Sequence, residues 1–482
     1  MLKRLVIVIF IMFGAFLSFS LYRTFAYDTS VVEETPSTTA LEYTFKIGNS
    51  SIKQITVDSG ETRYYDIVLG NPNNAKISYS VYYEMVSPST KPDGYSIGYT
   101  SKSTGTSTGK VDKNGNITLN IVVTNTSSST VTVKIGTVAG YVKGGELTLN
   151  SGQVIIPNAP VNAVELITKL NDNSSGDSGS GVYKVTHSAI PASSSATGSE
   201  IPAVTDYRYY GPNPNNYVCL DMEGQSTCPD KHLYRIIGSI YEEKENTNRI
   251  KLIKATRLTD GNIKFFSWDY TSSGSYNNIW ATITSGNYSN SLTSGSQLMK
   301  LLNSGVWWNG TSGSYYNQST TATTVNFTNY KLSDKAKSYI STSRYYLGGY
   351  NYSPLTNEMY GYERGALRYN TRPLYWEGMV GLMYPSDYGY AAGNTCVNGT
   401  ILINYNGECK NNDWLYISNT AQWLMSSYSS NSYSVFIVDY DGLVSNRYSN
   451  SRNTVRPVFY LTPSASITYG DGSIDNPYLI GL

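Results

Sequence analysis

Two polar runs near the C-terminus hold the residues whose types and spacing suit recognition chemistry. Residues 426–434 read Ser-Ser-Tyr-Ser-Ser-Asn-Ser-Tyr-Ser, and residues 445–453 read Ser-Asn-Arg-Tyr-Ser-Asn-Ser-Arg-Asn. Such runs combine rigid aromatic area with adaptable hydrogen bonding, as binding loops do. A genome of biased base composition would also enrich Tyr and Asn, and this alternative stays open. The contact residues that we expect are Tyr428, Asn431, Tyr433, Asn446, Arg447, Tyr448, Asn450 and Arg452.

Few side chains in the sequence suit acid–base or nucleophilic catalysis. The only histidines are His187, in a predicted linker, and His232, which we expect at the surface just before a strand. The sequence has no Gly-x-Ser-x-Gly elbow, no phosphate loop and no zinc signature. Glu358, Glu363 and Asp387 lie in Tyr- and Gly-rich stretches that would suit sugar hydrolysis, but we interpret them as solvated loop charges. The sequence predicts no enzyme and no cofactor, with a glycan-acting enzyme as the alternative.

The four cysteines form two locally spaced pairs. This spacing predicts the disulfides Cys219–Cys228 and Cys396–Cys409, each closing a small loop and contributing about 2–3 kcal/mol. A metal site would need Cys-x-x-Cys pairs or histidine partners. Neither pair has that spacing, so we expect no metal.

The N-terminal segment has the layout of an export signal. Lys3 and Arg4 precede an uncharged stretch over 5–22, and Ala26 offers a small residue at a cleavage position. Residues 1–26 are therefore either a cleaved signal peptide or a membrane anchor through residues 5–22 with its basic end inside. Both alternatives predict an exported protein, either anchored in the membrane at the cell surface or secreted.

The length and composition of the chain limit what kind of protein it can be. A chain of 482 residues is long enough for two or more domains. The net charge of +1 gives no electrostatic basis for binding nucleic acid. Tyr is unusually common, with 45 residues against 11 Phe. Because a tyrosine ring can pack while its hydroxyl stays in water, this bias suits exposed sheets and contact surfaces.

The first half of the chain is patterned for β-strands. Residues 27–42 are a polar tether, and short alternating segments separated by turn residues then follow over 43–157. This pattern predicts an all-β, antiparallel sandwich of the immunoglobulin-like type. Residues 158–206 are rich in Gly, Ser and Asp, which is typical of a flexible linker.

The second half, 207–482, mixes helical and strand patterns and predicts an α+β domain. Ser294 or Ser296 can cap a helix that runs to Asn303, and Ser333 can cap a second one. Residues 435–438 read as a strand buried on both faces, and Asp441-Gly442 supplies a hairpin turn. The two polar runs would then flank a buried strand.

Six strings in this half resemble a largely uncharacterised family of exported surface proteins of gut bacteria. They are Tyr234-Arg-Ile-Ile-Gly238, Leu298-Met-Lys-Leu-Leu-Asn303, Leu382-Met-Tyr-Pro-Ser-Asp-Tyr-Gly-Tyr390, Asn412-Asp-Trp-Leu415, Val455-Arg-Pro-Val-Phe-Tyr-Leu461 and Gly470-Asp-Gly-Ser…Asn476-Pro-Tyr478. The resemblance implies a C-type-lectin-like fold for 207–482.

The chain departs from the enzymes and sugar-binding lectins of that fold. Calcium-dependent lectins carry a Trp-Asn-Asp run, whereas Asn412-Asp413-Trp414 has the wrong order, so calcium-dependent sugar binding is not expected. The spacing of Cys396 and Cys409 also differs from the close cysteine pair of formylglycine-generating enzymes.

The resemblance also implies a function. Domains of this fold are targets of diversity-generating retroelements, in which adenine-directed mutation of Asn codons yields Asn, Ser, Tyr, Asp and Arg. The runs 426–434 and 445–453 have that composition. We expect a displayed or secreted binding or adhesion protein that contacts an extracellular protein or glycan. A structural subunit of a surface fibre or layer is the alternative.

Overall fold

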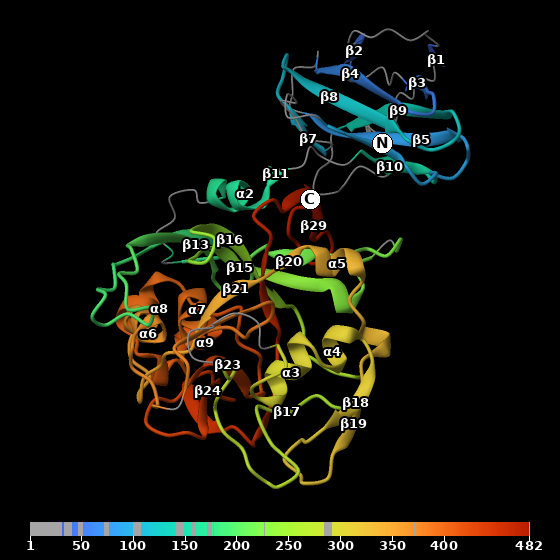
Figure 1. Cartoon of the computed structure of the whole chain (residues 1–482). Coiled ribbons are helices and arrows are strands. Elements are labelled where there is room, and N and C mark those ends of the chain that lie inside the picture. The colour runs from blue at the N-terminus through green and yellow to red at the C-terminus, as the bar shows by residue number, and fades with distance from the viewer. Residues whose placement is uncertain are drawn as a thin grey trace, which may run out of the picture. The chain divides into compact units, whose positions relative to one another are not determined.

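The computed structural model describes residues 31–32, 41–46, 52–71, 77–99, 108–140, 149–156, 161–170, 176, 178–225, 227–283, 292–370 and 372–481. The predicted signal or anchor, 1–26, lies outside these residues. Within them, no helix is long and apolar enough to cross a membrane. The protein is mostly β-sheet, and its internal contacts divide it into two compact units, Met1–Pro160 and Val161–Leu482 (Figure 1).

The first unit consists of two sheets. One has the order β2-β4-β8-β6, and the other has the order β1-β3-β9-β5-β10 with β7 on the side of β5. The strands of the first sheet are β2 (Leu41–Lys46), β4 (Glu61–Gly70), β6 (Tyr95–Tyr99) and β8 (Asn116–Asn125). Those of the second are β1 (Val31–Val32), β3 (Ile52–Val57), β5 (Ile77–Ser87), β7 (Thr108–Val111), β9 (Val131–Gly140) and β10 (Gln153–Ile155).

Alternation along the strands builds one core between the two sheets. Ile67 and Leu69 of β4 are buried, whereas Tyr64 of the same strand is 57% exposed. Residues from both sheets, such as Ile121 of β8 and Val133 of β9, belong to one buried cluster. The sequence predicted strands here but expected only antiparallel pairing, whereas β1–β3 and β2–β4 are parallel. Alternation identifies the buried face of a strand, but it does not fix the direction of its neighbour.

A ten-stranded sheet is the centre of the second unit. Its order is β11-β28-β29-β14-β15-β16-β27-β20, with β13 pairing with β15 and β12 with β13. These strands are β11 (Val161–Asn162), β12 (Gly181–His187), β13 (Val204–Tyr210), β14 (Tyr217–Cys219), β15 (Leu233–Glu242), β16 (Thr247–Lys254), β20 (Ile340–Ser341), β27 (Val458–Leu461), β28 (Ser466–Tyr469) and β29 (Tyr478–Gly481).

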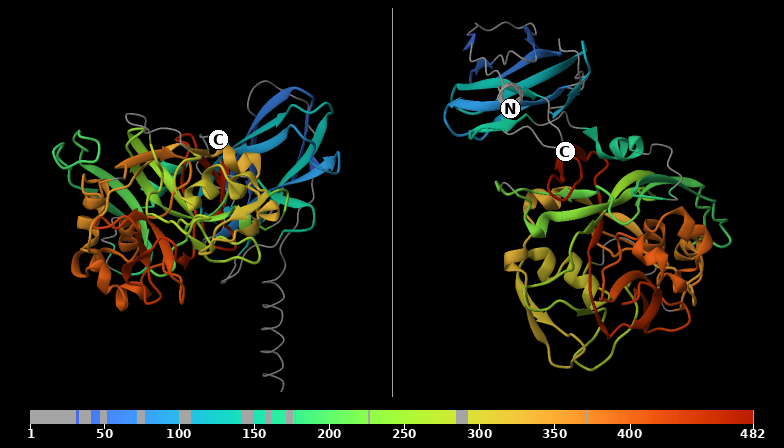
Figure 2. Two further views of the ribbon diagram at one scale, coloured as in Figure 1. Left: turned by 60° about the horizontal axis from the view of Figure 1, so that its bottom comes forward. Right: turned by 180° about the vertical axis from the view of Figure 1, so that it is seen from behind.

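Helices lie on both sides of this sheet. The helix α2 packs against β15 and β16 on one side, α3, α4 and α6 to α9 lie on the other, and α5 packs against the edge strand β20 (Figures 1 and 2). The helices are α2 (Ala163–Lys169), α3 (Gln297–Asn303), α4 (Val306–Asn309), α5 (Asp334–Ser338), α6 (Thr356–Arg364), α7 (Pro385–Ala391), α8 (Asn394–Gly399) and α9 (Glu408–Asn411), with 3₁₀ turns η1 (Asp230–His232), η2 (Thr328–Tyr330) and η3 (Leu402–Asn404).

Short strands complete the unit. Three are two-stranded pairs: β17 (Phe266–Ser267) with β26 (Arg452–Asn453), β18 (Ser312–Tyr315) with β19 (Thr323–Asn326), and β21 (Ser343–Tyr346) with β22 (Tyr375–Gly378). The last is the three-stranded sheet of β23 (Gln422–Ser427), β24 (Ser434–Val438) and β25 (Val444–Tyr448). Its central strand β24 is fully buried, as the sequence predicted.

The helix caps are also where the sequence placed them. The hydroxyl of Ser296 accepts a hydrogen bond from the Met299 N–H at 3.1 Å and so begins α3. Ser333 begins α5 in the same way by accepting from the Ala336 N–H. Local capping signals of this kind need no distant partner, which explains why they could be read from the sequence.

The stretch 158–206 is not a linker throughout. It contains α2 and β12, and it runs into β13, so the second unit begins at Val161 and not at residue 207. Gly- and Ser-rich composition suggested flexibility, but residues 181–187 form a strand, and all seven pair with β13. Pairing with a distant strand outweighed local composition.

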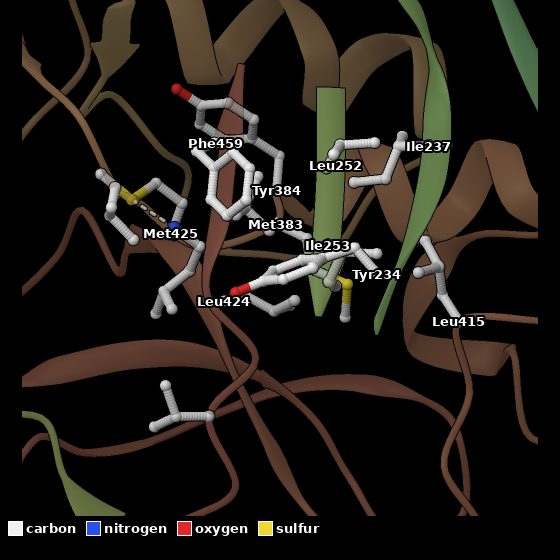
Figure 3. Packing of buried hydrophobic residues seen from close by; sticks show 14 of the residues in the cluster. Tyr234, Ile237, Leu252, Ile253, Met383, Tyr384, Leu415, Leu424, Met425 and Phe459 are labelled. Atoms are coloured by element: carbon white, nitrogen blue, oxygen red, sulfur yellow. Dashed lines mark hydrogen bonds between the residues drawn. The ribbon is translucent and has the colours of Figure 1, made fainter. Parts of the chain in front are cut away.

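The large sheet shares one buried cluster with β23 and with the segment between β22 and α7 (Figure 3). Tyr234 of β15, Ile253 of β16 and Phe459 of β27 belong to the same buried cluster as Met383 and Met425. The Met425 N–H donates to the Met383 carbonyl at 2.8 Å. The three-stranded sheet is therefore attached to the main core through β23.

Buried charges hold α7 against the large sheet. The carboxylate of Asp387 in α7 accepts from Arg208 of β13 at 2.9 Å and from Lys251 of β16 at 2.5 Å, and all three side chains are at most 2% exposed. Asp206 pairs with Arg208 at 2.7 Å and with the imidazole of His187 at 2.8 Å. Burial disfavours the charged form of Asp387, but Lys251 and Arg208 hold the pKa of this carboxyl below its usual value. The group is therefore ionised and paired.

Replacing Asp387 by Asn should destabilise the second unit by about 3–5 kcal/mol, because Lys251 loses its carboxylate partner in the interior. All seven tryptophans lie beyond residue 160, so their fluorescence in a urea titration reports this unit alone.

The control is Glu165→Gln, which removes an exposed ion pair with Lys169 on α2. That variant should unfold close to the wild-type midpoint. Equal midpoints for D387N and the wild type would show that the buried pair does not hold the unit together.

Candidate functional site

Four loops meet at one end of the three-stranded sheet, and we call them the tyrosine loops: 269–278, 349–352, 428–433 and 448–452. Backbone hydrogen bonds join them. The Asn278 N–H donates to the Ser432 carbonyl at 2.9 Å, and the Ser429 N–H donates to the Tyr350 carbonyl at 3.2 Å. The Asp269 N–H donates to the Ser449 carbonyl at 3.0 Å. Segments up to 180 residues apart in the sequence therefore form one local structure.

The turn between β23 and β24 is fixed by Asn431. Its side-chain oxygen accepts from the N–H groups of Tyr433 at 3.0 Å and Ser434 at 2.7 Å, which is an Asx turn. Its carbonyl also accepts from the Asn278 amide at 2.9 Å. Asn431 is thus a turn-forming residue, and Tyr433, two residues further on, is exposed.

Two exposed tyrosines lie side by side in these loops. Tyr433 is 40% exposed and Tyr448 is 54% exposed. Their ring centroids are 5.2 Å apart with an interplanar angle of 87°, so the edge of one ring meets the face of the other. The Ser449 N–H donates to the Tyr433 carbonyl at 2.8 Å, which holds the two backbones together. Rigid aromatic side chains with free surface are suited to binding because little entropy is lost on contact.

Some of the other residues predicted from the sequence are exposed, and one supports the loops. Asn446 and Arg452 are exposed, and Asn450 is partly exposed. Tyr428 is partly buried: its hydroxyl donates to the Asn351 carbonyl at 2.6 Å, and its ring lies 5.7 Å from that of Phe436. Tyr428 therefore supports the loops more than it offers surface.

The side chain of Arg447 extends along β25 toward the hairpin turn between β24 and β25. Its guanidinium pairs with Asp439 at 3.0 Å and stands 4.9 Å over the ring of Tyr440, which is 47% exposed. The positive charge is thus already partnered. Tyr440 was not among the sequence-predicted residues because it lies outside both polar runs.

Sequence reasoning also missed tyrosines from distant segments. Tyr350 and Tyr362 stack in parallel with centroids 3.9 Å apart, and Tyr352 is 45% exposed. Tyr270 and Tyr276 stack at 6.3 Å in the loop 269–278. The Tyr-rich string from 345 to 352 was the signal available in the sequence. Its proximity to the run 426–434 depends on the fold.

The acids considered for catalysis are not all solvated. Glu358 is exposed on α6, as expected, but Glu363 is 0% and Asp387 is 2% exposed, so the interpretation of these two as solvated loop charges was wrong. Glu363 accepts from the Ser386 N–H at 2.9 Å and from the Ser386 hydroxyl at 2.5 Å. Burial raises the pKa of Glu363 to about 7. Glu363 joins α6 to α7, Asp387 joins α7 to the large sheet, and both acids are buried.

Both histidines are buried as well. His187 was expected in a linker, but it lies in β12, stacks on Tyr360 at 3.6 Å and pairs with Asp206. His232 was expected at the surface, but it is 0% exposed in η1. The fold determines which residues contact each histidine, and the sequence around each one did not show these contacts.

The disulfides are as predicted: Cys219–Cys228 and Cys396–Cys409 are both formed. The second lies in the wall of a hollow of about 450 Å³. Polar side chains such as Asn404, Glu408 and Asn411 line this hollow, and none of its lining residues belongs to the tyrosine loops.

Comparisons with known protein families, curated proteins and solved structures found no match to this chain.

The raised pKa of Glu363 predicts a pH-dependent stability. Because the unfolded carboxyl ionises near pH 4.5 and the folded one near 7, the unfolded state releases its proton first, and the contribution of this carboxyl to stability falls as pH rises from about 4.5 to 7. Glu363→Gln removes this loss. Its free energy of unfolding relative to wild type should rise by roughly 3 kcal/mol between pH 4.5 and 8, measured by urea titration with tryptophan fluorescence.

Glu358→Gln, on the exposed side of the same helix, is the matched control for loss of a carboxylate. A stability difference between E363Q and wild type that does not change with pH would contradict the assignment.

Proposed function

We propose that this protein is an exported binding or adhesion protein and that the tyrosine loops of its second unit contact an extracellular protein or glycan. The exposed Tyr433–Tyr448 pair carries this proposal. It stands on loops joined by hydrogen bonds and supported by the buried strand β24. The two disulfides support an oxidising compartment outside the cell.

Electrostatics favour a ligand of low charge. Arg447 in these runs is already paired with Asp439, and Asp269 in the neighbouring loop is buried. The exposed groups of the pair are phenol rings and hydroxyls, which recognise sugar faces, amides and apolar side chains. A highly charged ligand would find few opposite charges there.

The fold that we propose follows the resemblance in the sequence. The first unit would be an immunoglobulin-like spacer, and the second would be C-type-lectin-like. In support, the first unit has two sheets around a single core, and the second combines a large sheet with short helices and long loops. The export signal or anchor at 1–26 would place the second unit outside the cell.

The exposed pair should control binding. Replacing both Tyr433 and Tyr448 by Ala should weaken binding at least tenfold, since truncating an aromatic contact residue commonly costs more than about 1 kcal/mol. The measurement is binding of the full chain to an array of neutral glycans and extracellular-matrix proteins. Raising the salt concentration should change wild-type binding little, because few unpaired charges are involved.

Tyr64→Ala is the matched control, because Tyr64 is 57% exposed but lies in the first unit. The double variant must keep the wild-type unfolding midpoint. Binding retained by the double variant, or lost equally with Y64A, would count against this surface. Self-association of the wild type in place of array binding would favour the structural-subunit alternative.

Diversification of the two runs leads to a separate expectation. Ser426, Ser449 and Asn453 lie in these runs but are at most 1% exposed. If the runs are diversified, related genes of the same genome should vary at Tyr433, Tyr448 and the other exposed positions and keep these three buried residues. Sequencing those genes tests this pattern, and equal variation at buried and exposed positions would contradict it.

A further inference from the structure

We propose that Asp221, Glu223 and His232 form a zinc-binding site in the second unit. Each offers one ligand atom, and these atoms lie within 4.8 Å of one another. The Nε2 atom of His232 is 3.0 Å from the Oε1 atom of Glu223. Two ligands at 2.0–2.1 Å from a tetrahedral zinc ion stand about 3.3 Å apart. Little movement would therefore bring both atoms onto one ion.

A disulfide in the local chain holds these ligands together. Strand β14 ends at Cys219, and the disulfide to Cys228 closes the loop that carries both acids. The turn η1 then places His232 directly before β15. Because the loop is short and cross-linked, its two carboxylates are held beside the imidazole.

Supporting contacts orient the acids. The Ser333 hydroxyl, which also caps α5, donates to Asp221, and the Glu223 N–H donates to the same carboxylate at 3.0 Å. Hydrogen bonds of this type orient ligands in metal sites. Glu223 is exposed, so an ion and a completing water molecule could enter from that side.

The imidazole of His232 lies beside the two acids, and its Nε2 atom is the one that faces Glu223. The side chain is 0% exposed, and its Nδ1 atom has no hydrogen-bond partner. Zinc bound at Nε2 would take the place of the hydrogen bond to Glu223 and would leave Nδ1 as it is.

The donor set selects the ion. One imidazole nitrogen and two carboxylates suit zinc, whereas calcium sites use oxygen ligands almost entirely. The other histidine differs, because the carboxylate facing His187 is already occupied by Arg208 at 2.7 and 3.1 Å. Of the two histidines, only His232 faces carboxylates that lack an arginine partner.

Lys231 is the competitor for this site. Its ammonium lies 2.9 Å from the Oε1 atom of Glu223, the atom that also faces His232. A bound ion would displace it, which is feasible because the Lys231 side chain is 22% exposed. If the group were only a structural ion pair, Lys231 would complete it and no ion would be needed. Removal of the lysine therefore separates the two explanations.

The test is calorimetric titration of the untagged full-length protein with zinc chloride. We expect saturable binding of one zinc ion that weakens at least about tenfold in Glu223→Gln, since a direct ligand is lost. Lys231→Met should tighten binding about three- to tenfold by removing the competing cation. Asp230→Asn is the matched control, because this neighbouring acid is outside the ligand set, and its affinity should equal that of the wild type.

Absence of saturable zinc binding would overturn the proposal. So would equal affinities of E223Q and D230N, or an unchanged or weaker affinity of K231M, because the ion would then lie elsewhere. Competition by calcium at equal concentration would contradict the choice of zinc. All three substitutions are at positions with some solvent exposure, and the unfolding midpoint of each variant without zinc confirms that it is folded. Zinc should raise that midpoint in the wild type and not in E223Q.

Discussion

The second unit depends on the pairing of charges that are removed from water. Asp387 lies between Arg208 and Lys251 and so connects α7 with two strands of the large sheet. Arg249 and Glu242 form another such pair at 3.0 Å, with both side chains 0% exposed. An isolated ion in this interior would be strongly unfavourable. Each partner can therefore occupy only the place where its counterion lies, and this fixes α7 on the sheet.

That constraint extends outward to the loops. Glu363 of α6 binds Ser386 of α7, so the two helices are held together. The segment between β22 and α7 contacts β23 through the backbone hydrogen bond from Met425 to Met383. Strand β24 is then buried along its whole length between β23 and β25, and the edge strand β25 reaches the surface. The position of Tyr433 and Tyr448 thus depends on a core that contains neither residue.

The parts of this structure that the sequence revealed are those with local causes. The caps Ser296 and Ser333, the buried strand 435–438 and both disulfides follow from residues close to one another in the chain. The failures have distant causes. Asp387 is paired with Lys251, 136 residues away, so its loop-like surroundings gave no sign of burial. His187 and its strand appeared to be linker because β13, their partner, was not recognised as a neighbour.

The sequence likewise predicted only part of the candidate site. Sequence composition identified the two runs and hence Tyr433 and Tyr448, because Tyr, Ser and Asn suit surface contact wherever they lie. It did not distinguish residues that face solvent from those that build the loop. Asn431 and Tyr428 are residue types that are common in binding loops, but their polar groups already form hydrogen bonds within the protein. The Asn431 side-chain oxygen bonds to the N–H groups of Tyr433 and Ser434, and the Tyr428 hydroxyl bonds to the Asn351 carbonyl. That distinction requires the register of the strands and the loops beside them.

Charge and aromaticity are distributed in an unusual way in this unit. Only 15% of the chain is charged, and several of those residues are used in the interior, among them Arg208, Lys251 and Asp387. Apart from the exposed Arg452, the surface of the loops is left to tyrosine, serine and asparagine. These residues stay hydrated through hydroxyls and amides, and they carry no charge that a substitution would leave unpaired. Exchanging one exposed residue of this set for another therefore disturbs the fold little, whereas the interior tolerates almost no change. A charged core beneath a neutral polar surface is thus a physical basis on which the surface could vary while the scaffold stays the same.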